Sequence, residues 1–131
     1  MQYVTNFREL DVYKLSRHLS KEIFEITKKF PKEEMYSLTD QVRRSSRSVG
    51  AQIAEAWGKR KYEKHFVSKL TDADGEQLET QHWIEVALDC NYISSELAQN
   101  ILRQLTSVGN MLNSMIIKSA SFCKPPTKAL K

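Results

Sequence analysis

Apolar residues recur every three or four positions along four long stretches of the chain, the spacing that places them on one face of an α-helix. The four stretches are residues 11–30, 36–57, 63–88 and 95–122. Short polar links join them, and no run resembles a β-strand of useful length. Amphipathic helices with short connections bury their apolar faces by packing against one another. The pattern therefore predicts an all-α fold, an up-down-up-down antiparallel four-helix bundle.

The ends of the predicted helices carry sequence signals of their own. Pro31 ends the first helix, and Gly58 suits the end of the second. Ser37 or Thr39 is placed to cap the start of the second helix, because a hydroxyl oxygen accepts a hydrogen bond from the unpaired backbone N–H groups there. We expect one domain over residues 1–123, followed by a flexible C-terminal tail at 124–131 that contains a proline pair.

Length and composition suit a single domain that lies outside the membrane. The chain has 131 residues, of which 40% are hydrophobic and 27% charged, and no stretch is apolar enough to span a bilayer. Residues 1–10 lack the apolar segment of a signal peptide. Cys90 and Cys123 end successive antiparallel helices, so they lie too far apart for a disulfide. We expect free thiols, a cytoplasmic location and no membrane partner.

Charge is unevenly distributed, although the net charge is only +4. Residues 36–69 carry eight Lys and Arg against three Asp and Glu, whereas residues 70–102 carry seven Asp and Glu and no Lys or Arg. The second predicted helix and the link after it are therefore basic, and the third helix is acidic. The basic group consists of Arg43, Arg44, Arg47, Lys59, Arg60, Lys61 and Lys64.

This basic group has the composition of a nucleic-acid-binding surface. Arg43 and Arg47 are four residues apart and share a helix face. Aromatic side chains, including Trp57 and Tyr62, lie among the charges. Basic residues interleaved with aromatic rings can contact a phosphate backbone and stack on exposed bases. RNA or DNA is thus one candidate partner.

The alternative is that carboxylates neutralise the basic residues. Arg43 and Arg44 could donate to Glu55, or to Glu76 and Glu79 on the next helix. The remaining basic residues would then pair with acidic residues of the same chain or of a neighbouring copy. Exposed ion pairs of this kind contribute only about 0–1 kcal/mol each. The sequence leaves both interpretations open.

Three large aromatic residues fall outside the apolar faces of the predicted helices. They are Trp57, Tyr62 and Trp83. A small bundle rarely needs two additional tryptophans, so these residues form a candidate interface between copies of the chain. The other interpretation is a core that is broader than one apolar face.

Motifs for catalysis are nearly absent. The chain lacks the phosphate-binding patterns GxxxxGK[ST] and GxGxxG and the nucleophile turn GxSxG. Glu79 and His82 have the Glu-x-x-His spacing of di-iron bundles, which also need a second copy and two further inward carboxylates. Glu22 and Glu55 fall outside the apolar stripes. We therefore expect no metal, no cofactor and no enzymatic activity.

Residues 38–58, with the sequence LTDQVRRSSRSVGAQIAEAWG, resemble the second helix of a known family of four-helix bundles, the ribosomal RNA intervening-sequence proteins. Members of that family typically show Gln-Ile-Arg-Arg-Ala-x-x-Ser-Ile-x-x-Asn-Ile-Ala-Glu-Gly at this place. Weaker matches extend the resemblance over about residues 5–122. Gln52 and Ala56 stand where the family usually has Asn and Gly, which puts in doubt any role that rests on that Asn.

The resemblance implies a bacterial homopentamer, with bundles arranged as a ring around a central channel and no established enzymatic activity. A related protein, the accessory variability determinant of diversity-generating retroelements, has the same architecture and binds nucleic acid and a reverse transcriptase through basic surface. Family members are known from genes inside intervening sequences of bacterial large-subunit ribosomal RNA.

Two function classes follow from these observations. The first is a non-enzymatic ring-forming module that binds nucleic acid through the basic group, which symmetry repeats around the ring. The second is a protein-binding scaffold or adaptor, in which the acidic third helix and the additional aromatic residues contact a partner protein. Binding that weakens steeply with salt would favour the first class.

Overall fold

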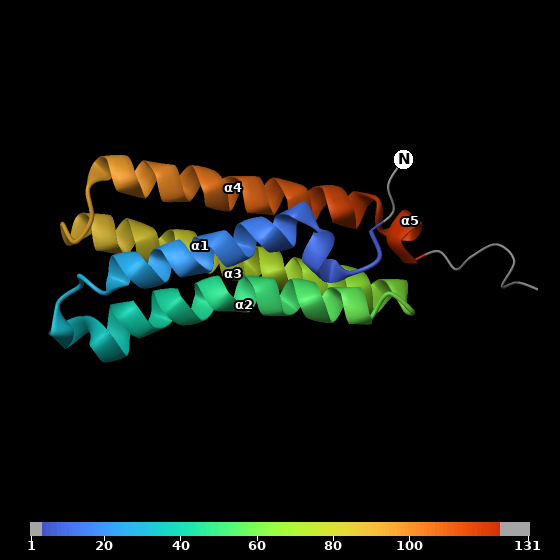
Figure 1. The fold of residues 1–131 in the computed structure, drawn as a ribbon, viewed down its shortest axis with the longest axis horizontal. Coiled ribbons are helices and arrows are strands. Elements are labelled where there is room, and N and C mark those ends of the chain that lie inside the picture. The colour runs from blue at the N-terminus through green and yellow to red at the C-terminus, as the bar shows by residue number, and fades with distance from the viewer. Residues whose placement is uncertain (1–3, 124–131) are drawn as a thin grey trace, which may run out of the picture.

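Four long helices form an antiparallel bundle in the computed structural model, which describes residues 4–123 (Figure 1). They are α1 (Asp11–Thr27), α2 (Asp40–Gly58), α3 (Glu63–Asp89) and α4 (Ser95–Ile117). Successive helices run in opposite directions, and α4 returns to pack against α1. The predicted all-α bundle is confirmed, and residues 4–123 contain no strand. The predicted tail, residues 124–131, lies outside the described residues.

The core follows the apolar stripes of the sequence. Its largest fully buried side chains include Leu19, Ile23, Ile53, Phe66, Leu70, Ile101, Leu105 and Leu112. Small residues on α2 and α3, including Ala56 and Ala73, are buried completely and let these two helices make the most extensive contact in the bundle. The hydroxyls of Ser45 and Thr80 satisfy each other across this contact at 2.8 Å. A buried polar pair is tolerated when its hydrogen bond is made.

The N-terminal side of α2 differs from the sequence prediction. A 3-10 turn, η2 (Lys32–Glu34), leads into a π-helical turn, η3 (Met35–Thr39), before α2 begins. The cap is the carboxylate of Glu34, which accepts a hydrogen bond from the Leu38 backbone N–H at 3.4 Å. The prediction that a Ser37 or Thr39 hydroxyl caps the helix was wrong. The Ser37 hydroxyl instead donates to Glu34 at 2.7 Å, and Thr39, although it is the residue before α2, forms no capping hydrogen bond through its side chain.

Two other helix ends also differ from the prediction. α1 ends at Thr27 rather than at residue 30, and the backbone N–H groups of residues 28–30 form tighter i→i−3 hydrogen bonds ahead of Pro31. α4 ends at Ile117, and a separate short helix, α5 (Ser119–Cys123), folds over the end of the bundle. The Ser119 hydroxyl donates to Glu63 at 2.6 Å, which ties α5 to the start of α3.

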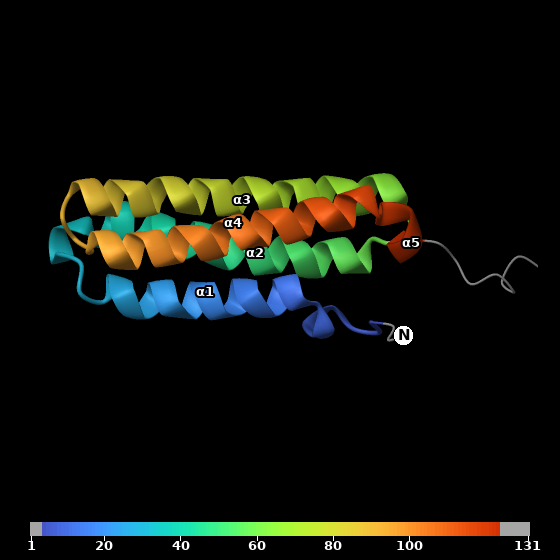
Figure 2. The ribbon, with the colours of Figure 1, turned by 90° about the horizontal axis from the view of Figure 1, so that it is seen from above.

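The two ends of the bundle are held differently. At one end lie η1 (Phe7–Glu9), the α2–α3 link and α5, as Figure 2 shows from above. At the other end, the Tyr92 hydroxyl donates to Glu34 at 2.8 Å and joins the α3–α4 link to the α1–α2 link. Cys90 directly follows α3 and Cys123 ends α5, so they lie at opposite ends of the bundle, and both are free thiols, as predicted. No helix within residues 4–123 is long and apolar enough to cross a membrane.

Candidate nucleic-acid interface

The structure distributes the predicted basic group over three places. Arg43 and Arg47 lie on the side of α2 that faces α1, whereas Arg44 reaches across to α3. The remaining four residues, Lys59, Arg60, Lys61 and Lys64, lie at the α2–α3 link and the first turn of α3. Residues at positions 43 and 44 diverge because successive helical side chains are about 100° apart.

On the α1 side, three cations surround one aromatic ring. The guanidinium carbons of Arg43 and Arg47 lie 4.7 and 5.4 Å from the centre of the Phe24 ring, and the Lys28 ammonium lies 4.9 Å from it. Arg43 Nε also donates to the buried Thr27 hydroxyl at 2.7 Å, which fixes its orientation. These four residues, Phe24, Lys28, Arg43 and Arg47, are called the Phe24 cluster.

The charge of the Phe24 cluster is incompletely neutralised. Lys28 pairs with Glu25 at 3.2 Å, but Arg43 and Arg47 form no ion pair with any residue between 4 and 123. Like charges a few ångströms apart repel by about 1 kcal/mol per pair in water and by more near a protein surface. An anion placed over the cluster would relieve this repulsion, so the geometry favours an anionic ligand.

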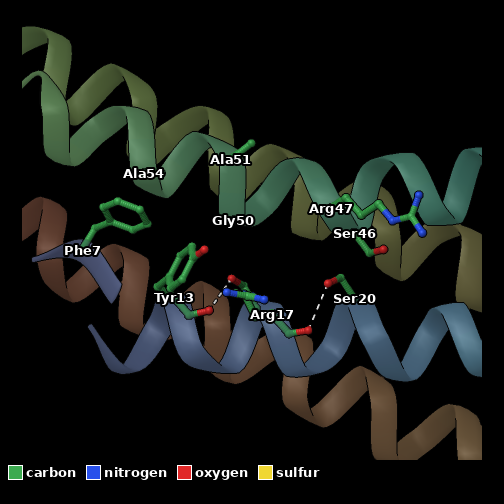
Figure 3. A pocket seen from close by; sticks show the side chains of 10 residues that line it. Phe7, Tyr13, Arg17, Ser20, Ser46, Arg47, Gly50, Ala51 and Ala54 are labelled. Atoms are coloured by element: carbon green, nitrogen blue, oxygen red, sulfur yellow. Dashed lines mark hydrogen bonds between the residues drawn. The ribbon is translucent and has the colours of Figure 1, made fainter. Parts of the chain in front are cut away.

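A cavity of about 240 Å³ lies in the same groove, between α1, α2 and η1 (Figure 3). Phe7 and Tyr13 meet edge to face at one end, with ring centres 4.9 Å apart. The Arg17 guanidinium lies 5.9 Å from the centre of the Tyr13 ring, and Arg47 lies on the facing helix. No Asp or Glu lines this cavity. The cavity together with the Phe24 cluster is called the α1/α2 groove.

The opposite side of α2 is neutralised. Arg44 Nη2 donates to Glu79 at 2.9 Å, and the Trp83 indole N–H donates to the same carboxylate oxygen at 3.0 Å. Glu55 pairs instead with Lys69 at 2.9 Å. For Arg44, the structure therefore supports the interpretation as a partner of acidic α3, specifically of Glu79.

The α2–α3 link forms a second, separate basic patch. The Arg60 guanidinium stacks over the Trp57 ring at 3.6 Å, and its Nε donates to the Trp57 carbonyl oxygen at 2.8 Å. Lys59, Lys61 and Lys64 are exposed around it and form no ion pair with residues 4–123. This patch lies at the end of the bundle where η1 and α5 also lie.

The three aromatic residues predicted for a subunit interface have different environments. Trp57 and Trp83 are partly buried and pack against the core of their own chain. Tyr62 is 57% exposed. Two further apolar residues, Leu78 on α3 and Ile117 at the end of α4, are 55% and 83% exposed. The interface remains a prediction, with Tyr62 as its most exposed member.

The Glu-x-x-His pair is occupied by contacts within the chain. Glu79 accepts from Arg44 and Trp83, and the His82 ring lies edge-on against Trp83 at 4.7 Å. Within residues 4–123, no group of three or more His, Cys, Asp and Glu side chains is placed to hold a metal ion.

The sequence reasoning also missed the contribution of η1 and α1. Phe7, Tyr13, Arg17 and Phe24 line the α1/α2 groove, yet residues 1–35 are nearly neutral as a whole. A signal was present in the spacing, since Tyr13 and Arg17, and also Phe24 and Lys28, are aromatic–cation pairs four residues apart. Charge summed over a segment hides such a pattern on one face.

Comparisons with solved structures and with protein families both identify relatives of this chain. The chain resembles a crystal structure of a protein of unknown function from the S23 ribosomal protein family of Bacteroides thetaiotaomicron, with 29% sequence identity and a TM-score of 0.74. That match covers 80% of this chain and 94% of the other. No curated protein matches. Residues 8–114 match the sequence model of the family described as "23S rRNA-intervening sequence protein". The chain therefore belongs to the 23S rRNA-intervening sequence protein family.

Proposed function

We propose that the protein is a non-enzymatic homo-oligomer, a pentameric ring, that binds RNA or another nucleic acid through its basic surface in the cytoplasm. The observation that carries this proposal is the Phe24 cluster, in which Arg43 and Arg47 are held on one ring without a carboxylate partner among residues 4–123. The family name, which refers to an intervening sequence of 23S rRNA, supports RNA as the ligand.

Assembly would compensate for the small net charge of one chain. The +4 of a single copy is too small to attract nucleic acid strongly. A closed ring repeats the Phe24 cluster and the α2–α3 link patch once per copy, which raises the local density of cations and lets one strand contact several copies. Arg44 contributes little, because Glu79 already neutralises it.

Light scattering coupled to size exclusion tests assembly and binding together. We expect a mass near five times 15.2 kDa. We also expect a gain in mass with a short single-stranded RNA at about 50 mM salt that disappears at high salt, because neutralised phosphates release counterions. A monomer would contradict the ring. The absence of any gain with RNA at low salt would contradict nucleic-acid binding.

A matched pair of charge reversals locates the binding surface. The double variant Lys28→Glu/Arg47→Glu reverses two exposed cations of the Phe24 cluster. Arg103→Glu/Lys118→Glu makes the same change of net charge at exposed positions at and just after α4. We expect the first variant to lose RNA binding and the second to retain most of it. Equal losses would show that only total charge matters.

The second candidate function is a protein-binding scaffold or adaptor. The observation that favours it is the acidic stretch at residues 70–102, where Glu79 alone forms an ion pair with a Lys or Arg among residues 4–123. Leu78 is exposed on the same helix. Under this alternative, Lys28→Glu/Arg47→Glu would disturb assembly or partner binding and would have no RNA binding to remove.

A further inference from the structure

We propose that the α1/α2 groove is a pocket for a single unpaired nucleotide, with the base at the Phe7–Tyr13 end and the phosphate at the Arg47 end. The inference deepens the proposed function, because it names the part of the nucleic acid that enters the groove. The same chemistry is offered by a free nucleoside monophosphate and by a nucleotide within a single strand. The experiment below distinguishes these two sources.

The size of the cavity suits one flat ring system. Pockets for drug-sized ligands occupy about 300–1,000 Å³, and the cavity here is about 240 Å³. It is partly open, with α1 on one side and α2 on the other (Figure 3). A group the size of one base fits, whereas a paired base inside a duplex would have to unpair before it could enter.

One end of the cavity is lined by aromatic rings and suits an aromatic ligand. The Phe7 and Tyr13 rings stand nearly perpendicular, at 86°, so that they present both a face and an edge. Guanidinium groups accompany both rings, with Arg8 4.5 Å from the Phe7 ring centre and Arg17 5.9 Å from that of Tyr13. Bases stack on aromatic rings and on guanidinium planes, and this stacking tolerates any base sequence.

The other end is suited to an anion. Arg47 extends from α2 away from Phe7 and Tyr13 in Figure 3, and its guanidinium carbon lies 5.4 Å from the centre of the Phe24 ring. Arg47 has no ion-pair partner within residues 4–123. Arg binds phosphate bidentately through its planar fork of N–H donors. The aromatic end and the cationic end therefore match the two halves of one nucleotide.

Small residues keep the cavity open and leave hydrogen-bond acceptors in it. A Cβ on Gly50 would lie 3.3 Å from Ser16 Oγ and 3.7 Å from the Tyr13 ring, so even alanine there would crowd this wall. The hydroxyls of Ser16 and Ser46 donate to carbonyls of their own helices at 2.8 and 3.1 Å. Their oxygens retain lone pairs that can accept from N–H groups of a base.

The test uses one variant that fills the cavity and one that removes a charge. Ala54→Leu adds bulk to the α2 wall of the cavity, and Arg17→Gln removes a guanidinium from an exposed position on α1. Ser107→Leu introduces a leucine at an exposed position on α4 and is the matched control for bulk. Arg103→Gln, also on α4, is the control for charge. Circular dichroism checks that each variant folds.

The probes are a fluorescent oligoadenylate, a blunt duplex of equal length, and AMP. We expect Ala54→Leu and Arg17→Gln each to weaken oligoadenylate binding by about tenfold, the scale of one lost stacking contact. Duplex binding should change little with Ala54→Leu, and the two α4 controls should leave both affinities unchanged. AMP should compete with the oligoadenylate and lose its affinity in Ala54→Leu.

Failure of this inference differs from failure of the proposed function. If wild type binds the oligoadenylate and Ala54→Leu binds it equally well, the pocket is overturned and nucleic-acid binding stands. If wild type binds AMP in a manner sensitive to Ala54→Leu but binds no strand, the pocket stands as a site for free nucleotides and the proposed function falls. If wild type binds neither probe, both are overturned.

Discussion

The two sides of α2 differ in whether carboxylates neutralise their arginine residues. Toward α3, the contact is closed: small buried side chains pack tightly, and the Arg44–Glu79 and Lys69–Glu55 pairs lie along it. Toward α1, the contact includes a cavity and cations that lie on aromatic rings, and Arg47 has no carboxylate partner among residues 4–123. The first arrangement stabilises the bundle, and the second leaves charge available to a ligand.

The difference shows why a basic segment cannot be interpreted from its net charge. Arg43, Arg44 and Arg47 lie within five residues, yet one is neutralised by Glu79 and two surround Phe24. Whether a cation is available depends on which neighbouring helix it faces. The following experiments test that distinction, from the largest expected effect to the smallest.

The largest effect should come from adding bulk on the closed side. Ala73 is completely buried, so Ala73→Leu overpacks the core and should lower the free energy of unfolding by about 1–3 kcal/mol. Ala54→Leu, which adds the same bulk to the cavity side, should change it by less than about 0.5 kcal/mol. Urea unfolding measures both. Equal losses would mean that the α1/α2 groove is as tightly packed as the core.

The next effect distinguishes the two adjacent arginines. Arg43→Met removes the hydrogen bond to the buried Thr27 hydroxyl, and hydrogen bonds to charged groups contribute about 1.5–3 kcal/mol. Because Arg43 is partly exposed, we expect the lower end of that range. Arg44→Met removes a half-exposed ion pair and should cost about 0–1 kcal/mol. Thermal unfolding of the two variants would refute this order if Arg44→Met were the less stable.

A smaller effect should appear in the salt dependence of RNA binding. Removing one phosphate contact lowers the slope of log K against log salt by about 0.7–0.9. We expect this change for Arg47→Gln, whose side chain has no ion-pair partner among residues 4–123. Arg44→Gln should change the slope less, because Glu79 already neutralises Arg44. Fluorescence anisotropy at several salt concentrations measures the slopes. Identical slopes for Arg47→Gln and Arg44→Gln would contradict the claim that only Arg47 is available to phosphate.

The smallest effect concerns the hydrogen bond between the Tyr92 hydroxyl and the Glu34 carboxylate at the end of the bundle. The hydrogen bond to Glu34 raises the pKa of Tyr92 from 10.0 to about 12. The unfolded chain loses this phenol proton near pH 10 and the folded chain near pH 12, so the contribution to stability is present below pH 10 and is lost as pH rises to 12. Tyr92→Phe should remove this part of the pH dependence. A wild type and variant with parallel stability curves from pH 9 to 12 would contradict the prediction.

The same pair should also act at acidic pH, with the opposite sign. Hydrogen bonds from Ser37 and Tyr92 lower the pKa of Glu34 below its ordinary 4.5. The unfolded chain therefore takes up this proton first, and the contribution to stability is lost as pH falls below 4.5. The acid limb of the unfolding curve of Ser37→Ala should be shallower than that of wild type.

The fold could be predicted from the sequence because one apolar stripe determines how each helix packs. Val42, Val49 and Ile53 are buried as their spacing predicts. The helix ends could not be predicted as well. The hydrogen bond to the Leu38 backbone N–H is made by Glu34, which lies outside the predicted helix. Hydroxyl and carboxylate oxygens near a helix start can accept from the same backbone N–H groups. Which of them accepts depends on the geometry of the preceding turn.

The candidate site could be predicted only in part. The basic residues of α2 were visible in the sequence, but the pairing of Phe24 with Arg43 and Arg47 depends on how α1 aligns with α2. Core packing sets that alignment, and the apolar pattern of a single helix carries no information about it. The cavity depends on the small residues Gly50 and Ala54, and it becomes visible only when the facing helix is in place.

The two cysteines offer labelling positions with which the proposed assembly can be examined. Burial raises the pKa of the Cys123 thiol, whereas Cys90 is exposed at the opposite end of the bundle. Thiolates are the species that react with maleimides, so a substoichiometric dye at neutral pH should attach to Cys90 first. Each labelled subunit would then carry one fluorophore at a known end. Energy transfer between such labels would report whether neighbouring bundles stand parallel or head to tail.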